Sequence, residues 1–378
     1  SINLLTGEST INSYGTFFSN TLTAGENLSV SRYIFPSEPF TCSINLLDQN
    51  GTSITSFDVE NVETQKNVQT ILKGDFFSEN ASSGSLSLTL NQEWDADKIY
   101  VVEPAITAIP IADANFKAYL VANFDTDGDG EISAAEAKQI TTIYVNTDDI
   151  YSLDGIEYCT NLTTLYCNGS SEWDSNSIFY ISKGSLTKID LSKNTHLTEL
   201  VCSYNQLTEL DLSKNTQLIT VECNSNQLSQ LDLSNNTNTK LISCDNNQLT
   251  ELNLSNCLDI TALYCSGNQI TQLNLNNNTQ LSVLDCSDNQ LSQLDLRLNA
   301  QLIYLYCVNN QLSQLDLNNN TRLTNLHCSS NQLTELDLSN NTALQSARCP
   351  DNPLETIFVF EGYSFTLEKP ETTQIVVK

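Results

Sequence analysis

The sequence has little that would support catalysis, nucleic-acid binding or insertion into a membrane. Its 378 residues include no methionine and two histidines, His196 and His327, which lie at unrelated positions of a repeat. No histidine-based triad, zinc signature or phosphate loop is present, which argues against an enzyme. The 16 Lys and Arg residues oppose 45 Asp and Glu, and the net charge of −29 would repel nucleic acid and anionic membranes.

Long apolar runs are also missing. No stretch approaches the ~20 residues that cross a bilayer, and no signal peptide is visible, so we expect no transmembrane segment. The chain begins at Ser1 rather than at methionine. We interpret this start as a mature or trimmed form, which leaves room for an export signal or a lipid anchor removed during maturation.

What the sequence does contain is a strict repeat. Nine of the twelve cysteines share one repeat position, eight of them at intervals of 21 residues: Cys167, Cys202, Cys223, Cys244, Cys265, Cys286, Cys307, Cys328 and Cys349. Such periodicity indicates a solenoid, in which each repeat forms one turn that stacks on the next. Equivalent positions of adjacent turns lie ~4.8 Å apart with parallel Cα–Cβ bonds, which is poor disulfide geometry. We therefore expect reduced thiols that act as small buried hydrophobes.

Changes in composition divide the chain into four parts. Residues 1–104 carry alternating aromatic and β-branched stretches separated by turns, and they predict an immunoglobulin-like β-sandwich. Residues 105–139 predict a short amphipathic helix followed by an EF-hand-like cap. Residues 140–356 hold ten repeats of 21 or 22 residues, one of which has about 14 additional residues. Residues 357–378 break the pattern and are interpreted as a C-terminal β cap.

A candidate calcium loop follows the predicted helix. Residues 125–136 read DTDGDGEISAAE. An EF-hand loop places oxygen ligands at positions 1, 3, 5, 7, 9 and 12 and glycine at position 6. The chain supplies Gly130 at the turn and the ligand set Asp125, Asp127, Asp129, Glu131, Ser133 and Glu136. Calcium sensors usually pair such loops, so we expect one structural calcium ion that stabilises the solenoid cap rather than a switch.

The repeat itself carries a family resemblance. A typical copy, residues 197–215, reads LTELVCSYNQLTELDLSKN. Its first half is similar to the leucine-rich-repeat consensus LxxLxLxxNxL, with Cys202 in the third leucine slot. The repeat length and this cysteine, behind a helical cap, resemble the cysteine-ladder internalins and related bacterial surface repeats. The resemblance implies an asparagine ladder at Asn205 and its equivalents, and an extracellular adhesin or host-interaction module.

The second half of each repeat, LxxLDLSxN, is nearly as regular as the first. It leaves no room for a helix on the convex side, so the predicted fold is a mainly β leucine-rich-repeat solenoid of about ten turns, with a short helical N-cap and a preceding β-sandwich. Cys257 replaces the second asparagine in one turn. We expect one uniform acidic column to be hydrogen-bonded locally or shielded by cations: Asp190, Asp211, Asp232, Asn253, Asn274, Asp295, Asp316 and Asp337.

Packing demands the same residue in every turn, whereas recognition does not, so variable columns are candidates for ligand binding. The slot before each ladder cysteine varies most and should face solvent. The candidate ligand-binding residues are Tyr264, Asp285, Tyr304, Tyr306, His327 and Arg348. They could hold a protein or a glycan. Alternatively, tyrosine simply tolerates a solvated strand. Trp173, in the inserted loop, is a second exposed candidate.

These observations favour an extracellular or cell-surface recognition and adhesion protein that binds a protein partner through the solenoid face. A carbohydrate-binding surface protein and a passive structural spacer are the alternatives that the sequence leaves open. We expect a monomer whose partner is an extracellular protein or glycan. The varied column argues mildly against a passive spacer.

Overall fold

The computed structural model describes residues 40–47, 53–62, 72–73, 100–101, 108–174 and 179–378. The chain divides into two compact units, Ser1–Ala108 and Ile109–Lys378. No helix in the described part has the length and apolar character needed to cross a membrane.

The first unit is described through four strands. Strands β1 (Phe40–Leu47) and β2 (Ser53–Val62) pair antiparallel, while β3 (Leu72–Lys73) and β4 (Tyr100–Val101) pair parallel. The remaining segments of the predicted immunoglobulin-like sandwich lie outside the described residues. That assignment therefore stays a prediction.

The second unit opens with two helices that cover the first turn. Helix α1 (Ala114–Phe124) begins at Asp113, whose side chain accepts the N–H groups of Asn115 and Phe116, and it buries its apolar face. Helix α2 (Ala134–Gln139) begins at Ser133 with a capping box. The helix predicted at the start of the cap is therefore present.

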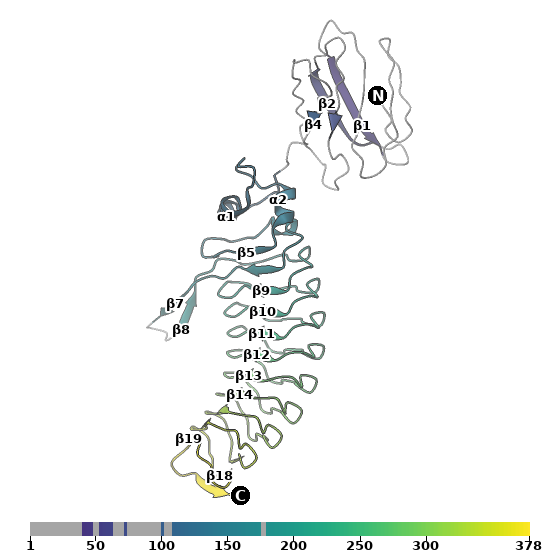
Figure 1. Cartoon of the computed structure of the whole chain (residues 1–378). Coiled ribbons are helices and arrows are strands. Elements are labelled where there is room, and N and C mark those ends of the chain that lie inside the picture. The colour runs from purple at the N-terminus through teal and green to yellow at the C-terminus, as the bar shows by residue number, and fades with distance from the viewer. Residues whose placement is uncertain (1–39, 48–52, 63–71, 74–99, 102–107, 175–178) are drawn as a thin grey trace. The chain divides into compact units, whose positions relative to one another are not determined.

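The solenoid then runs to the end of the chain, and its main feature is an eleven-stranded parallel sheet. Each turn contributes one strand of three residues, in register with its neighbours (Figure 1). The strands are β5 (Thr142–Tyr144), β6 (Thr164–Tyr166), β9 (Glu199–Val201), β10 (Thr220–Glu222), β11 (Leu241–Ser243), β12 (Ala262–Tyr264), β13 (Val283–Asp285), β14 (Tyr304–Tyr306), β15 (Asn325–His327), β17 (Ser346–Arg348) and β19 (Thr366–Glu368). This arrangement confirms the leucine-rich-repeat solenoid, and β19 adds one turn to the ten predicted.

The other side of each turn is mostly extended chain. It forms a three-stranded sheet near the C-terminus from β16 (Glu335–Asp337), β18 (Thr356–Val359) and β20 (Gln374–Val377). Within residues 140–174 and 179–378, the one helical segment is a 3-10 turn, η1 (Ile156–Tyr158). Because a 21-residue turn has no room for a helix, the chain crosses the convex side in extended conformation.

The additional residues of the second turn form a hairpin. Strands β7 (Ser171–Asp174) and β8 (Phe179–Ser182) pair antiparallel and project from the side of the solenoid (Figure 1). The predicted position of the insertion is thus correct. The side chain of Trp173 lies outside what the structure describes, so its exposure stays a prediction.

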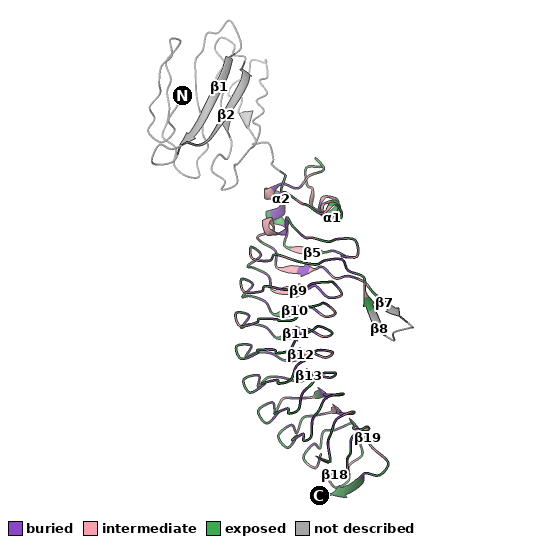
Figure 2. Ribbon diagram, turned by 180° about the vertical axis from the view of Figure 1, so that it is seen from behind, coloured by how far each residue is buried: buried purple, intermediate pink, exposed green. Residues whose placement is uncertain are grey.

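The core is a stack of identical side chains. Leucines and ladder cysteines of successive turns are fully buried, as at Leu284 and Cys286, and Figure 2 shows buried and exposed positions alternating around each turn. All eleven cysteines of the second unit are free thiols. Burial raises the pKa of Cys167 to about 12 and raises those of Cys244 and Cys265 well above the usual value. These thiols are packing groups and not nucleophiles.

Two asparagine ladders tie the turns together. Asn226 donates from Nδ2 to the carbonyls of Cys202 and Cys223, both at 3.1 Å, and accepts the Leu207 N–H at 3.0 Å. This confirms the first ladder. In the second ladder, Asn215 donates to two carbonyls of the preceding turn while its buried Oδ1 atom has no hydrogen-bond partner among the described residues.

Candidate functional site

The solvent-facing side of the eleven-stranded sheet, here called the sheet face, is where the turns differ from one another. In a typical strand the middle residue is buried and the first and third are partly exposed. In nine of the eleven strands the third residue is the slot before a ladder cysteine, and in β5 and β19 it precedes Val145 and Lys369. The exposed fraction reaches 61% at Tyr144 and 40% at Tyr304.

The structure brings the six predicted ligand-binding residues together. Five of them are direct neighbours across β12 to β17, because register pairs Tyr264 with Asp285, then Tyr306, His327 and Arg348 in turn. Tyr304 is the first residue of the strand that ends in Tyr306. The set is therefore one continuous patch.

The C-terminal end of this patch is partly neutralised. Arg348 donates from Nε to Glu368 on β19 at 2.9 Å, and the rings of Tyr306 and His327 lie 6.4 Å apart at 72°. Burial, with a smaller contribution from Arg348, lowers the pKa of His327. His327 is therefore neutral at pH 7, where it offers a hydrogen-bonding group and not a charge.

A second group of tyrosines lies at the N-terminal end of the sheet face. Tyr144 and Tyr166 are adjacent, with ring centroids 4.8 Å apart. The Tyr166 hydroxyl donates to Glu199 at 2.5 Å, and this hydrogen bond, together with burial, raises the pKa of Tyr166 to about 12. Both tyrosines occupy the variable slot but were not predicted as site residues. They were not grouped with Tyr264 because several turns with fewer aromatic residues separate them from it in the sequence.

An acidic segment begins beside Tyr166 and runs into the predicted patch, and the sequence singled out only one of its residues, Asp285. It comprises Glu199, Glu222, Asp245 and Asp285, here called the acidic cluster. Burial first, and then Glu199, raises the pKa of Glu222. Burial also raises the pKa of Asp245, although Ser266 donates to it from N at 2.7 Å and from Oγ at 2.9 Å. Asp245 directly follows the ladder cysteine Cys244 and so lies outside the variable slot.

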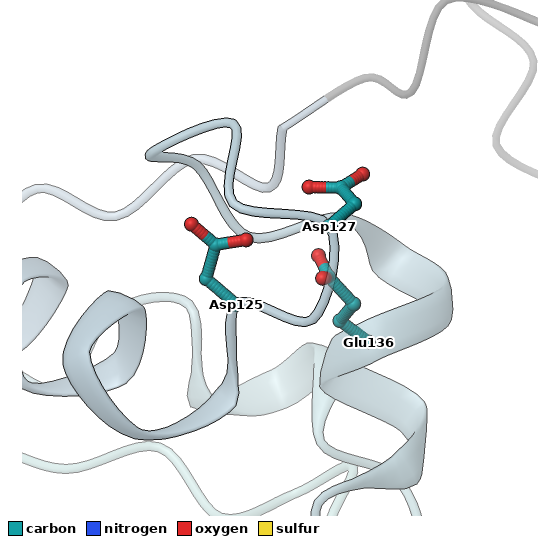
Figure 3. Close-up of side chains that lie close together, drawn as sticks. All are labelled: Asp125, Asp127 and Glu136. Carbon is teal, nitrogen blue, oxygen red and sulfur yellow. The ribbon is translucent and has the colours of Figure 1, made fainter.

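The predicted calcium loop is folded in a form that suits a cation. Oxygen atoms of Asp125, Asp127 and Glu136 all lie within 4.8 Å of one another (Figure 3). Gly130 stands at the turn with φ of 82°. Burial alone would raise the pKa of Glu136, but hydrogen bonds from Ser133 and Thr126 lower it to about 2, so it is ionised at neutral pH.

The other predicted loop ligands lie in the same segment. The side chain of Asp129 accepts the N–H of Glu131 at 2.8 Å, and Glu131 pairs through its side chain with Lys117 at 2.6 Å. That pairing leaves the Glu131 carbonyl as its contribution to a cation, as expected at position 7. Hard oxygen donors grouped around a glycine turn fit Ca²⁺.

The uniform acidic column belongs to the scaffold. Its members accept the backbone N–H two residues ahead, as Asp211 does from Ser213 at 2.9 Å and Asp316 from Asn318 at 3.0 Å. This confirms the local hydrogen bonding that the sequence predicts for the column.

Comparison with known proteins agrees with this architecture. No protein-family model matches the sequence, and no curated protein matches it. Among solved structures, the functional domain of InlJ from Listeria monocytogenes, described as including a cysteine ladder, is 33% identical with a TM-score of 0.59. The match covers 68% of this chain and 58% of that one. The internalin InlF from Listeria monocytogenes is 21% identical over 71% of this chain and 91% of its own, with a TM-score of 0.42.

The fold thus defines a leucine-rich-repeat solenoid. Its structural neighbours are internalin-like leucine-rich-repeat proteins, one of which shares the cysteine ladder. The chain spans little more than half of the InlJ domain that it matches.

Proposed function

We propose that this protein is an extracellular or cell-surface recognition module that binds a protein partner through the sheet face. The supporting observation is the contrast between the two sides of each strand. Buried positions repeat the same leucine and cysteine in almost every turn, whereas the third strand position changes among Tyr, Val, Glu, Ser, Asp, His and Arg. A scaffold needs the first feature, and selective binding needs the second.

The sheet face carries no arrangement suited to catalysis in the described residues. His327 has an aromatic ring and Arg348 as its neighbours, and the ladder thiols are buried with raised pKa values. Tyrosines supply large, rigid contact area at low entropic cost, which is the chemistry of binding. The similarity to internalin-like structures supports the same proposal, including its location outside the cell.

The test is binding of the whole purified chain to arrays of extracellular proteins and of glycans. The Tyr264→Ser/Tyr306→Ser variant should bind a captured protein at least tenfold more weakly. The matched control is Leu258→Ser/Leu298→Ser, which removes exposed apolar side chains outside the sheet and should have no effect. Equal binding by wild type and the tyrosine variant would refute the sheet face as the site, and glycan-only capture would replace a protein partner with a carbohydrate.

We also propose that the loop 125–136 binds one structural calcium ion. The loop is preorganised for a cation, because the glycine turn and the capping box already hold the carboxylates close together. Since the loop connects α1 to α2 directly before β5, an ion there would hold the cap on the first turn. The effect expected is on stability and not on a conformational switch.

Calcium should therefore raise the melting temperature, by about 5 °C when it is 100-fold above its Kd. Asp125→Asn/Asp127→Asn should abolish this shift. Asp259→Asn/Asp351→Asn removes the same charge from exposed turns and should retain it. A melting temperature that is the same in calcium and in chelator would refute the structural ion.

A further inference from the structure

The acidic cluster is distinctive because nothing in the described fold neutralises it. Six ion pairs occur among the described residues, and none involves Glu199, Glu222, Asp245 or Asp285. Strands β5 to β14 contain no lysine or arginine. A cation facing the cluster would have to come from outside this surface.

The cluster is also partly desolvated. Glu222 and Asp245 are half-buried, and burial raises the pKa of each carboxyl group. Charged groups that have lost water without gaining a counter-charge are destabilised until an opposite charge approaches. This part of the sheet face therefore gains electrostatic free energy from a cationic ligand.

The neighbours of the cluster indicate what kind of cation would fit. Tyr166, which already donates to Glu199, lies on one side, and Tyr264 and Tyr306 alternate with Asp285 on the other. Aromatic faces interleaved with carboxylates suit the long side chains of lysine and arginine, whose methylenes pack on rings while their charged ends reach acids. The strands from β9 to β13 span about 19 Å at ~4.8 Å per strand, which several residues of a peptide would cover.

We propose that the sheet face between β9 and β13 docks a protein segment rich in lysine and arginine, with the acidic cluster as its charge complement. This inference rests on the proposed function and specifies the partner. The opposite end of the face, near His327 and the paired Arg348, has a different electrostatic character. The bound segment is therefore expected to be cationic over the cluster only, which fixes its placement along the solenoid.

The experiment measures binding of a nona-arginine peptide by calorimetry at low and at physiological salt. The test variant is Glu199→Gln/Glu222→Gln/Asp285→Asn. The control is Glu209→Gln/Glu251→Gln/Glu335→Gln, which removes the same charge from exposed positions off the sheet face and so reproduces any effect of net charge. The test variant should bind at least tenfold more weakly than wild type, and the control less than twofold.

Equal weakening of both variants would mean non-specific attraction to an acidic protein and would overturn the proposal. Melting curves check that the variants fold, and the single change Glu222→Gln serves if the triple variant does not. Calcium binding can also be measured in the Asp125→Asn/Glu136→Gln variant, which disables the loop. Calcium that still binds to this variant, and no longer binds when the acidic cluster is also removed, would show that the cluster is a cation site and not a docking surface.

The inference can fail while the proposed function stands. A protein partner whose binding is lost in Tyr264→Ser/Tyr306→Ser but unchanged in the cluster variant would support recognition by the sheet face and refute the cationic segment. A partner indifferent to both sets of changes would refute the proposed function itself. Loss of binding in both, with the control unaffected, is the result expected here.

Discussion

The first asparagine of each repeat uses its whole amide group to close the turn that follows a strand. Asn289 donates from Nδ2 to the carbonyls of Cys265, Cys286 and Ser287 at 2.9 to 3.2 Å. Its Oδ1 accepts the N–H of Ile270 at 2.9 Å. No apolar side chain of similar size could satisfy these buried backbone groups.

Replacing Asn289 by alanine should therefore destabilise the solenoid by about 3 kcal/mol, since it leaves several buried polar groups without partners. Asn276→Ala is the control, because Asn276 is exposed and its loss should change stability by less than about 0.5 kcal/mol. Urea denaturation followed by circular dichroism measures both. Equal midpoints for the two variants would contradict the role assigned to the ladder.

The sequence shows which residues are structural, but it does not show how many hydrogen-bond partners each of their side chains has. Cys257 can be recognised as an exception, yet only the structure shows its Sγ 3.9 Å from two carbonyls of the preceding turn, in place of the amide of an asparagine. Ser329 is another case. In an equivalent turn Ser287 accepts the N–H of Val308, whereas the buried Ser329 hydroxyl has no partner because its counterpart is Pro350, which has no N–H.

At the scale of elements, the β7–β8 hairpin is inserted without disturbing the stack. Its base is held by two glycines, Gly169 and Gly184, which lie so close that a Cβ atom on Gly169 would be 2.4 Å from the Cα atom of Gly184. A Cβ atom on Gly169 would overlap the carbonyl oxygen of Tyr204, and one on Gly184 would overlap Oδ1 of Asn205. At the two positions where the hairpin leaves and re-enters the turn, there is room for the hydrogen atoms of glycine but not for a side chain.

Gly169→Ala and Gly184→Ala should each cost about 2 to 3 kcal/mol, because the backbone must shift to relieve the overlap. Gly362→Ala is the comparison. Gly362 has open space around its Cα but a φ of 76°, so alanine there pays only for the left-handed conformation, about 1 kcal/mol. Denaturation midpoints that rank Gly362→Ala as the most damaging change would refute the tight base.

The number and spacing of turns follow from the repeat, because one residue type recurs wherever a side chain is buried. The insertion was visible as a longer step between repeats. Its hairpin form was not, since two short strands give too little alternation to distinguish them from a loop. Apart from Asp285, the acidic cluster was missed for a related reason: its members occupy three different slots of the repeat, and only three-dimensional stacking makes them neighbours.

At the scale of the whole molecule, the cysteine ladder makes the free energy of unfolding depend on pH. The ladder thiols are buried with no cation beside most of them, and burial raises the pKa of Cys202, Cys223, Cys307 and Cys328 well above the usual value. In the fold, a buried thiol stays protonated and packs as an apolar group. Its contribution to the free energy of unfolding is complete only at pH values where the same thiol is also protonated in the unfolded chain. Periodicity alone predicted this burial, whereas the pKa shift required the structure.

The fold should therefore lose stability in alkali. In the unfolded chain a thiol ionises near pH 8.5, whereas in the fold Cys167 and Cys349 have pKa values of about 12. Below about pH 8.5 the unfolded and folded states bind the same number of thiol protons, so the stabilisation is complete. Above it the unfolded state binds fewer, and each ladder thiol removes about 1.4 kcal/mol per pH unit until pH approaches the folded value.

Nine such thiols act together, so unfolding free energy should fall steeply between about pH 8.5 and 10, far more than for a protein without the ladder. Urea midpoints measured under reducing conditions at successive pH values give the slope. Cys244→Val/Cys265→Val should reduce that slope by about two ninths whatever its effect on stability at pH 7, because two protons no longer leave on unfolding. A slope that is unchanged in this variant would mean that other groups, such as tyrosine hydroxyls, control the alkaline transition.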